Sequence, residues 1–177
     1  MRLIYFIIFF ILNIISSIIV AQTIVVVNIQ SLIDSNTMYQ SIINEMNKSQ
    51  KIYLDNFEKK ENELTTLLKE IENSKLILNE NEINLKITDY NNKLNDFTKL
   101  IDDFNSHYQN EIIVIRENVL KEIIVLLENY AIDNNVDLVL DSTSYLIASN
   151  SLDITTNINK QLSQIDMKLE YKNFEKN

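Results

Sequence analysis

Between residues 41 and 130, apolar side chains recur every three or four positions along two long segments that contain no glycine or proline. This spacing places the apolar side chains on one stripe of an α-helix, as in a coiled-coil seam. The first stripe consists of Ile43, Met46, Tyr53, Phe57, Leu64, Leu67 and Ile71. The second consists of Ile83, Ile87, Tyr90, Leu94, Phe97, Ile101, Phe104, Tyr108, Ile112, Ile115 and Val119, with a stutter near its end. The pattern therefore predicts two long helices that pair along their stripes.

A polar stretch at residues 72–82 separates the two stripes. It predicts that the chain turns back on itself and forms an antiparallel helical hairpin. Because the chain contains no glycine, we expect asparagines to take the left-handed backbone positions of the turn. These asparagines are Asn73, Asn79 and Asn81.

The same stretch contains three consecutive apolar residues, Leu76, Ile77 and Leu78. Such a triplet does not fit a one-sided helical stripe. It either folds over the open end of the hairpin or lies exposed as a contact surface.

The segments that flank the hairpin have a different pattern. Residues 23–29 and 136–140 are short β-branched runs, and residues 145–148 are a candidate third strand. A last amphipathic helix follows, with Asp153 placed to cap its first turn. Its predicted apolar face consists of Ile154, Ile158, Leu162, Ile165 and Leu169.

The predicted fold class is α+β, with a small β-rich trimerisation body and a long antiparallel helical-hairpin arm inserted between its strands. We expect residues 22–44 and 130–177 to form the body, which includes the C-terminal helix, and residues 45–129 to form the arm. A body this small is marginal alone, so several copies that share their sheets would gain core and cover their edge strands. The residues expected to hold the oligomer are Ile24, Val25, Val26, Val27, Ile29, Val136, Leu138, Val139 and Leu140.

The first 21 residues indicate export. Arg2 precedes an apolar run at residues 3–20, and the run ends at the small residue Ala21. This is the pattern of a cleavable signal peptide, residues 1–21. The length of the run leaves an uncleaved membrane anchor as the alternative.

The net charge argues against nucleic acid as a partner. The chain carries 16 Lys and Arg against 25 Asp and Glu, a formal net charge of −9, and removal of Arg2 with the signal peptide leaves −10. Binding to phosphates depends on clustered basic residues. The absence of cysteine excludes disulfides, thiolate metal sites and cysteine nucleophiles.

Residues that would support catalysis or metal binding are sparse. His107 is the only histidine, and we expect it on the solvated flank of a helix. Asp102 and Asp103 are adjacent, so on a helix they point about 100° apart and do not form a carboxylate pair. Acidic and amide residues at 133–137 alternate as at the start of a calcium loop, but the glycine and glutamate that such a loop needs are missing. We therefore expect no enzyme, no cofactor and no metal site.

The order and spacing of these elements resemble the Skp/OmpH family of periplasmic chaperones. The resemblance rests on the opening strand at residues 24–29, the long hairpin, the segment at residues 135–141 and the Asp-Ile-Thr sequence at residues 153–155. It implies a homotrimer whose strands build a β-barrel body, with three arms around a cavity. It also implies a periplasmic chaperone that holds unfolded outer-membrane proteins in this cavity without ATP.

One feature departs from the family pattern. The resemblance implies a strongly basic protein whose arms bind clients and membrane surfaces through positive charge. The arm of this chain instead carries many acidic residues among its lysines. We therefore expect apolar and aromatic side chains to matter more for holding clients than charge. The candidate client-contact residues are Leu76, Ile77, Leu78, Tyr53, Phe57, Phe97, Phe104 and Tyr108.

Two alternatives remain open from the sequence. The aromatic residues stand on the predicted seam, so they either bond the two helices together or face a client. The protein is either a holdase or a non-catalytic periplasmic or membrane-anchored coiled-coil spacer that tethers other components.

Overall fold

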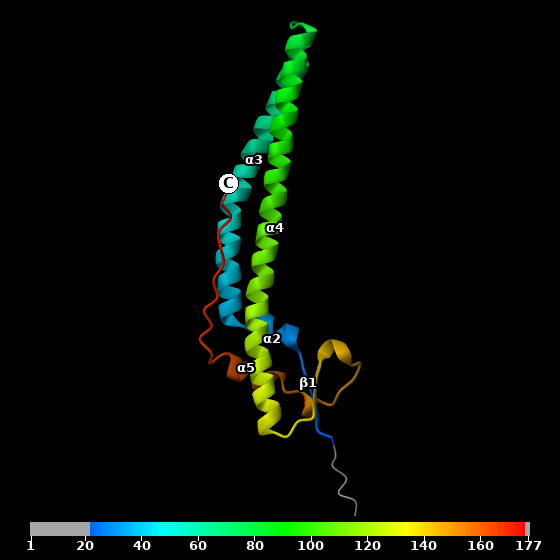
Figure 1. Ribbon diagram of the computed structural model, residues 1–177, viewed down its shortest axis with the longest axis vertical. Helices are drawn as coiled ribbons and strands as arrows, with labels where there is room; N and C mark the ends of the chain where they lie inside the picture. The colour runs from blue at the N-terminus through cyan, green and yellow to red at the C-terminus, as the bar shows by residue number, and fades with distance from the viewer. Residues whose placement is uncertain (1–21, 176–177) are drawn as a thin grey trace, which may run out of the picture.

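The computed structural model describes residues 22–175, which form a long two-helix arm on a small mixed body (Figure 1). In chain order the elements are β1 (Ile24–Val27), α2 (Ile29–Ser35), α3 (Thr37–Ser74), α4 (Glu80–Asp133), β2 (Leu138–Asp141), the single 3-10 turns η1 (Ser142–Ser144) and η2 (Asn150–Leu152), and α5 (Thr155–Leu162). The arm is inserted between the two strands, so the predicted α+β fold class is confirmed. The predicted signal peptide lies outside the described residues. No helix within residues 22–175 combines the length and apolar content that crossing a bilayer requires.

Asparagine side chains begin three of the helices. Asn28, Asn36 and Asn79 each have an extended backbone and accept a hydrogen bond from a main-chain N–H in the first turn of α2, α3 and α4. At α4 the cap is reciprocal, because Glu82 accepts from the Asn79 N–H in return. Such caps satisfy N–H groups that have no partner inside the helix.

The prediction that asparagines take left-handed backbone positions in the turn at the arm tip is wrong. Within the described chain, the one residue with positive φ is Asn135, at 50°, just after α4. At the tip the Ser74 carbonyl accepts from the N–H groups of Ile77 and Leu78, and Lys75 keeps a right-handed conformation. The turn therefore continues the helical hand until Asn79 starts α4 from an extended backbone, and no position in it needs positive φ.

The two strands pair in parallel. Ile24 lies opposite Leu138 and Val27 opposite Asp141. The pair is closed at its start by Asp137, whose Oδ2 accepts from the Thr23 N–H at 2.8 Å. Because α3 and α4 lie between the strands in sequence, this pairing joins the chain segment that leads into the arm to the one that leads out of it.

The prediction of a third strand at residues 145–148 is wrong. These residues are not in a strand, and Leu146 and Ile147 extend fully into solvent. The far side of β1 is met instead by Asp153, which forms an isolated parallel bridge with Val26, and the Ile154 N–H donates to the Val26 carbonyl at 2.9 Å. Thus β1 has partners on both sides, while β2 is the edge strand of this protomer.

The body core gathers β1, α2, α5 and the last part of α4. Its fully buried side chains include Leu32 and Ile33 of α2 and Val119 and Ile123 of α4. The other members are Val25, Val27, Leu127, Ile154, Ile158 and Leu162. One continuous helix, α4, therefore belongs to both the arm and the body.

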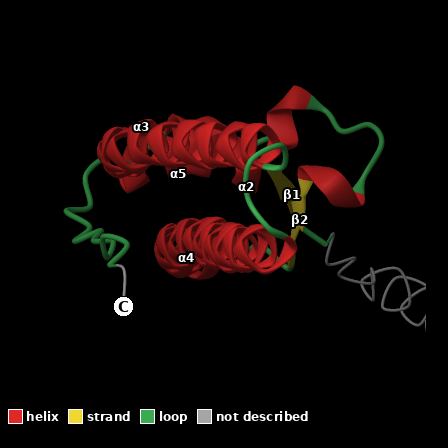
Figure 2. Ribbon diagram, turned by 90° about the horizontal axis from the view of Figure 1, so that it is seen from above, coloured by secondary structure: helices red, strands yellow, loops and turns green. Residues whose placement is uncertain are grey.

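The predicted C-terminal helix is correct at its start and wrong in its length. Asp153 Oδ1 accepts from the Thr155 N–H at 2.8 Å, but α5 ends at Leu162, and Ile165 and Leu169 are not helical. From residue 165 to 171 apolar and charged residues alternate, which is a period of two and cannot give a helix one apolar face. The C-terminal tail, defined here as residues 165–175, instead runs extended along the arm (Figure 1). Viewed along the arm, it lies on the side away from the strand pair (Figure 2).

Candidate functional site

An aromatic cluster forms where α3 and α4 face each other in the lower half of the arm. Phe104 of α4 is at its centre, with ring centroids 5.0 Å from Phe57, 5.7 Å from Tyr53 and 4.9 Å from Tyr108. Phe97 extends the cluster upward, 5.9 Å from Phe57. Most of these pairs are edge-to-face, the arrangement that aromatic quadrupoles favour.

The five aromatic residues expected at the arm are thus brought together, and their exposure divides them. Phe104 and Tyr108 are each only 3% exposed, so they serve the seam between the helices. Tyr53, Phe57 and Phe97 are half-buried and keep part of each ring accessible. Any client contact in this region is therefore open mainly to these three residues.

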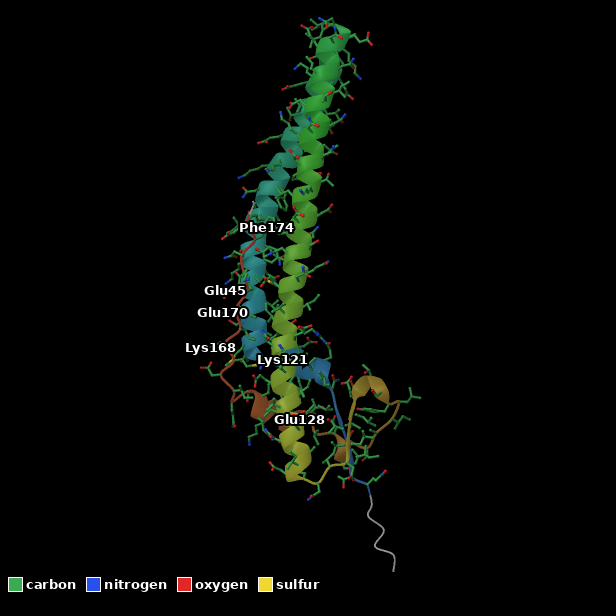
Figure 3. All side chains as sticks on the ribbon, in the orientation of Figure 1. Glu45, Lys121, Glu128, Lys168, Glu170 and Phe174 are labelled. Carbon is green, nitrogen blue, oxygen red and sulfur yellow. The ribbon has the colours of Figure 1, made fainter. Side chains whose placement is uncertain are left out.

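The tail contributes a sixth ring that the sequence patterns did not reveal. Phe174 is 7% exposed, and its centroid lies 5.6 Å from Tyr53, 5.5 Å from Phe104 and 5.6 Å from His107. The available signal was the alternation at residues 165–171, although Ile165 and Leu169 taken alone also continue the predicted helical face. In Figure 3, Phe174 lies farther up the arm than Lys168 and Glu170.

Polar side chains of the arm meet the main chain of the tail. His107, expected on a solvated flank, is half-buried, and its Nε2 lies 2.8 Å from the Lys172 carbonyl oxygen. Glu111 Oε2 accepts from the Lys172 N–H at 2.9 Å, and the Tyr53 hydroxyl donates to the Phe174 carbonyl. Ser49 Oγ donates to Asn173 Oδ1 at 2.6 Å.

The apolar triplet lies at the free end of the arm. Leu76 is 93% exposed and Ile77 is 86% exposed, while Leu78 is half-buried. Leu85, in the second turn of α4, is also well exposed. The first two residues of the triplet are therefore exposed and do not fold over the open end of the hairpin. They form an apolar tip.

Of the residues expected to hold an oligomer, some lie inside this protomer and some face outward. Val25, Val26 and Val27 are buried within the single chain. Ile24 and Leu138, paired with each other, are more than a third exposed. The remaining members of the expected set are half-buried: Ile29, Val136, Val139 and Leu140.

Asp141 joins the end of β2 to the start of α2. Its carboxylate accepts from Thr143 Oγ1 at 2.6 Å, from the Ile29 N–H at 3.1 Å and from the Thr143 N–H at 3.3 Å. The hydrogen bond from the Thr143 hydroxyl is the main cause that lowers the pKa of Asp141 below its ordinary value, and the main-chain hydrogen bonds add to it against the effect of burial.

These surfaces are suited to binding another polypeptide. They offer apolar rings, exposed aliphatic side chains and polar groups that reach a main chain. In the part of the chain that the structure describes, no three His, Cys, Asp or Glu side chains gather as a metal site would require.

The architecture defines a class of proteins in which a long helical hairpin projects from a small body built of both chain ends. The chain belongs to the OmpH-like family, since the family model described as outer membrane protein (OmpH-like) matches residues 23–162. The resemblance derived from the sequence is thereby confirmed.

A solved structure gives the same picture of the fold. A chain from Caulobacter crescentus CB15, named as an OmpH-like outer membrane chaperone, superposes with a TM-score of 0.64 over 88% of this chain and 93% of that one. The two are 11% identical, so the likeness concerns the fold. A search of curated proteins gives no match to this sequence. The tail lies beyond the residues that the family model matches.

Proposed function

We propose that this protein is an ATP-independent periplasmic holdase that binds unfolded outer-membrane proteins between the arms of a homotrimer and prevents their aggregation. Membership of the OmpH-like family supports a chaperone role. The observation that carries the proposal is the arm itself, whose apolar side chains remain accessible at a tip far from the body. A helix of 54 residues extends about 80 Å, so α4 holds this tip well clear of the core.

The exposed tip is suited to an unfolded client. Exposed contiguous apolar residues on a soluble protein usually mark a contact surface. Leu76 and Ile77 stand at the tip without neighbours that cover them, and the half-buried rings of Tyr53, Phe57 and Phe97 offer a second contact region lower on the arm. An unfolded outer-membrane protein exposes alternating apolar side chains that such surfaces can bind.

The trimer is part of the proposal. Among residues 22–175 the outer edge of β2 has no strand beside it, and exposed strand edges are normally covered by another strand or chain. Ile24 and Leu138 of the sheet, and Leu146 and Ile147 in the loop after β2, are exposed apolar side chains of the same body. Pairing of these edges among three copies would bury this surface.

An aggregation assay tests the proposed activity. Dilution of a denatured β-barrel membrane protein in the presence of the mature protein at near-stoichiometric amounts should suppress light scattering. A coiled-coil spacer, the alternative function, would leave scattering unchanged. The mass of the protein, measured beside the assay, should be that of three copies.

A further inference from the structure

The C-terminal tail packs on the arm as an extended polypeptide with one face inward. The apolar side chains at residues 165, 167, 169 and 171 are half-buried, and the charged side chains between them at residues 166, 168, 170 and 172 are exposed. This is the side-chain alternation of a β-strand, with the apolar face against the helices. Leu169, Tyr171 and Phe174 extend the apolar cluster of the arm.

The arm holds this segment largely through the tail's main chain. Lys172 uses its N–H and its carbonyl, which meet Glu111 and His107, and Phe174 uses its carbonyl, which meets the Tyr53 hydroxyl. Such contacts do not depend on which side chain the segment carries. Main-chain hydrogen bonds combined with pockets for alternate side chains are a common way to bind extended peptides.

The docking of the described tail uses no ion pair with the arm. The one ion pair among residues 22–175 joins Lys93 to Asp89 within α4, so the charged side chains of the tail form none with the arm. The segment is therefore held by an aromatic anchor, Phe174, by main-chain hydrogen bonds that another polypeptide could make equally well, and by one side-chain hydrogen bond between Ser49 and Asn173.

We call the arm surface that the tail covers the groove; it includes Tyr53, Phe104, His107 and Glu111, and it continues past the end of the described tail. A cavity of about 700 Å³ lies beside Phe174, lined by Leu100, Asp103 and His107 among others. A larger cavity of about 890 Å³ follows farther up the arm between α3 and α4, lined by Leu64, Leu67, Phe97 and Leu100 on its apolar side. The arm thus offers room for a segment longer than the described tail, and this room has an apolar side in the upper cavity.

We propose that this groove of the arm is a binding site for extended polypeptide, and that the protein's own tail occupies it as an intramolecular competitor of the client. The inference rests on the proposed holdase function and adds the site and its regulation. The favoured ligand is a segment in which apolar residues alternate with polar ones and an aromatic residue follows, as in a strand of a transmembrane β-barrel. The client would displace the tail and meet the same three arm side chains: Tyr53, His107 and Glu111.

The test measures binding of a fluorescent peptide that has the sequence of residues 164–175, added to the full mature protein. Phe174→Ser removes the anchor of the attached tail, so the free peptide should bind this variant at least tenfold more tightly than the wild type. Lys168→Ser changes an exposed tail side chain and is the matched control, with affinity equal to that of the wild type. Adding His107→Ala to Phe174→Ser should weaken peptide binding again. Equal affinity for the wild type and a folded Phe174→Ser variant would overturn the proposal.

A disulfide lock tests the same point without loss of the anchor. Ser49 and Asn173 touch through their side chains, and the chain has no cysteine of its own, so Ser49→Cys with Asn173→Cys introduces the two thiols needed to fix the tail in place. The oxidised protein should bind the peptide at least tenfold more weakly than the reduced protein. Equal binding in both states would show that the tail is a permanent strap.

The two proposals fail separately. If the peptide competes with the tail but aggregation of a membrane protein is not suppressed, the holdase function is wrong and the groove stands. If aggregation is suppressed equally by the oxidised and reduced forms of the lock, the holdase function stands and the regulation by the tail is wrong.

Discussion

Asp141 shows how much a single side chain contributes to this small body. It is the last residue of β2, and its carboxylate ties the strand to the first N–H of α2 and to the turn that follows. Its hydrogen bonds add to the apolar core and to links such as the one from the Asn28 N–H to Thr155 Oγ1 at 2.8 Å. Thr23 and Asp137 make the corresponding link at the other end of the strand pair.

We expect Asp141→Ala to lower the free energy of unfolding by about 1 kcal/mol or more, because it leaves the Ile29 N–H without its acceptor. Urea denaturation at neutral pH measures the change. Asp55→Ala, at an exposed position of α3, is the control and should change the midpoint little. An unaltered midpoint in Asp141→Ala would contradict the role given to this carboxylate.

The same residue predicts a pH dependence. The pKa of Asp141 is lowered in the folded protein, so its carboxylate stabilises the fold at pH values above the unfolded-state pKa, whose ordinary value is 3.8. This contribution is lost as the pH falls through the lower folded-state pKa. In urea denaturation, the difference between the wild type and Asp141→Asn should therefore be larger at pH 6 than at pH 3. A difference that grows on acidification would reverse the sign and refute the assignment.

At the scale of elements, the two long helices were predictable because the apolar period of three and four persists over many turns and outweighs every local signal. The short elements were not. Residues 145–148 have strand-forming composition, but Asp153 takes the second side of β1, and these residues do not pair along β2 in the described chain. Ile165 and Leu169 fit a helical face and an extended face alike, and contact with the arm decides between them.

The candidate site was predictable in part for the same reason. The seam aromatics follow from the helical period, and the exposed tip follows from the triplet that breaks it. The tail on the aromatic cluster depends on tertiary packing between segments more than 60 residues apart, such as His107 with Lys172, which no local pattern encodes.

The reciprocal cap at the start of α4 predicts the stability of the arm tip. Asn79→Ala removes the acceptor for the Glu82 N–H and should cost about 1 kcal/mol locally. Hydrogen exchange at residues 80–84 should accelerate, while amides of the body core keep their protection. Asn81→Ala is the control, because Asn81 lies two residues after Asn79 in the first turn of α4 and is not part of the reciprocal cap.

At the scale of the whole molecule, the structure separates folding of the protomer from assembly. Val26 is 3% exposed within a single chain, so Val26→Asp should unfold the protomer, because an unpaired buried charge costs several kcal/mol. Leu138 is 46% exposed in the protomer, so Leu138→Asp should leave the fold intact and dissociate the proposed trimer. Circular dichroism and light scattering together distinguish the two effects. Leu54→Asp, similarly exposed on the arm, should change neither.

The apolar tip and the acidic balance predict how clients respond to salt. Screening at high ionic strength weakens Coulomb attraction, because the Debye length falls from about 10 Å at 0.1 M to about 3 Å at 1 M. Contact between apolar surfaces does not depend on this screening. Client affinity should therefore stay flat or rise with added salt, and changing Leu76, Ile77 and Leu78 together to Ser should weaken it without altering the mass or helix content. Binding that salt abolishes and the triple variant keeps would point to basic side chains of the arm instead.

The position of the arm between the two strands also determines the order in which the protein can fold. Thr23 and Asp137 are 114 residues apart in sequence, and pairing strands across so long a flexible loop carries a large entropy of closure. The contacts between α3 and α4 are shortest in sequence at the arm tip, so the hairpin can close there first and zip downward. A zipped hairpin brings β1 and β2 close to each other before they pair. The arm that we propose to hold other unfolded chains would then be the part of this protein that guides its own folding.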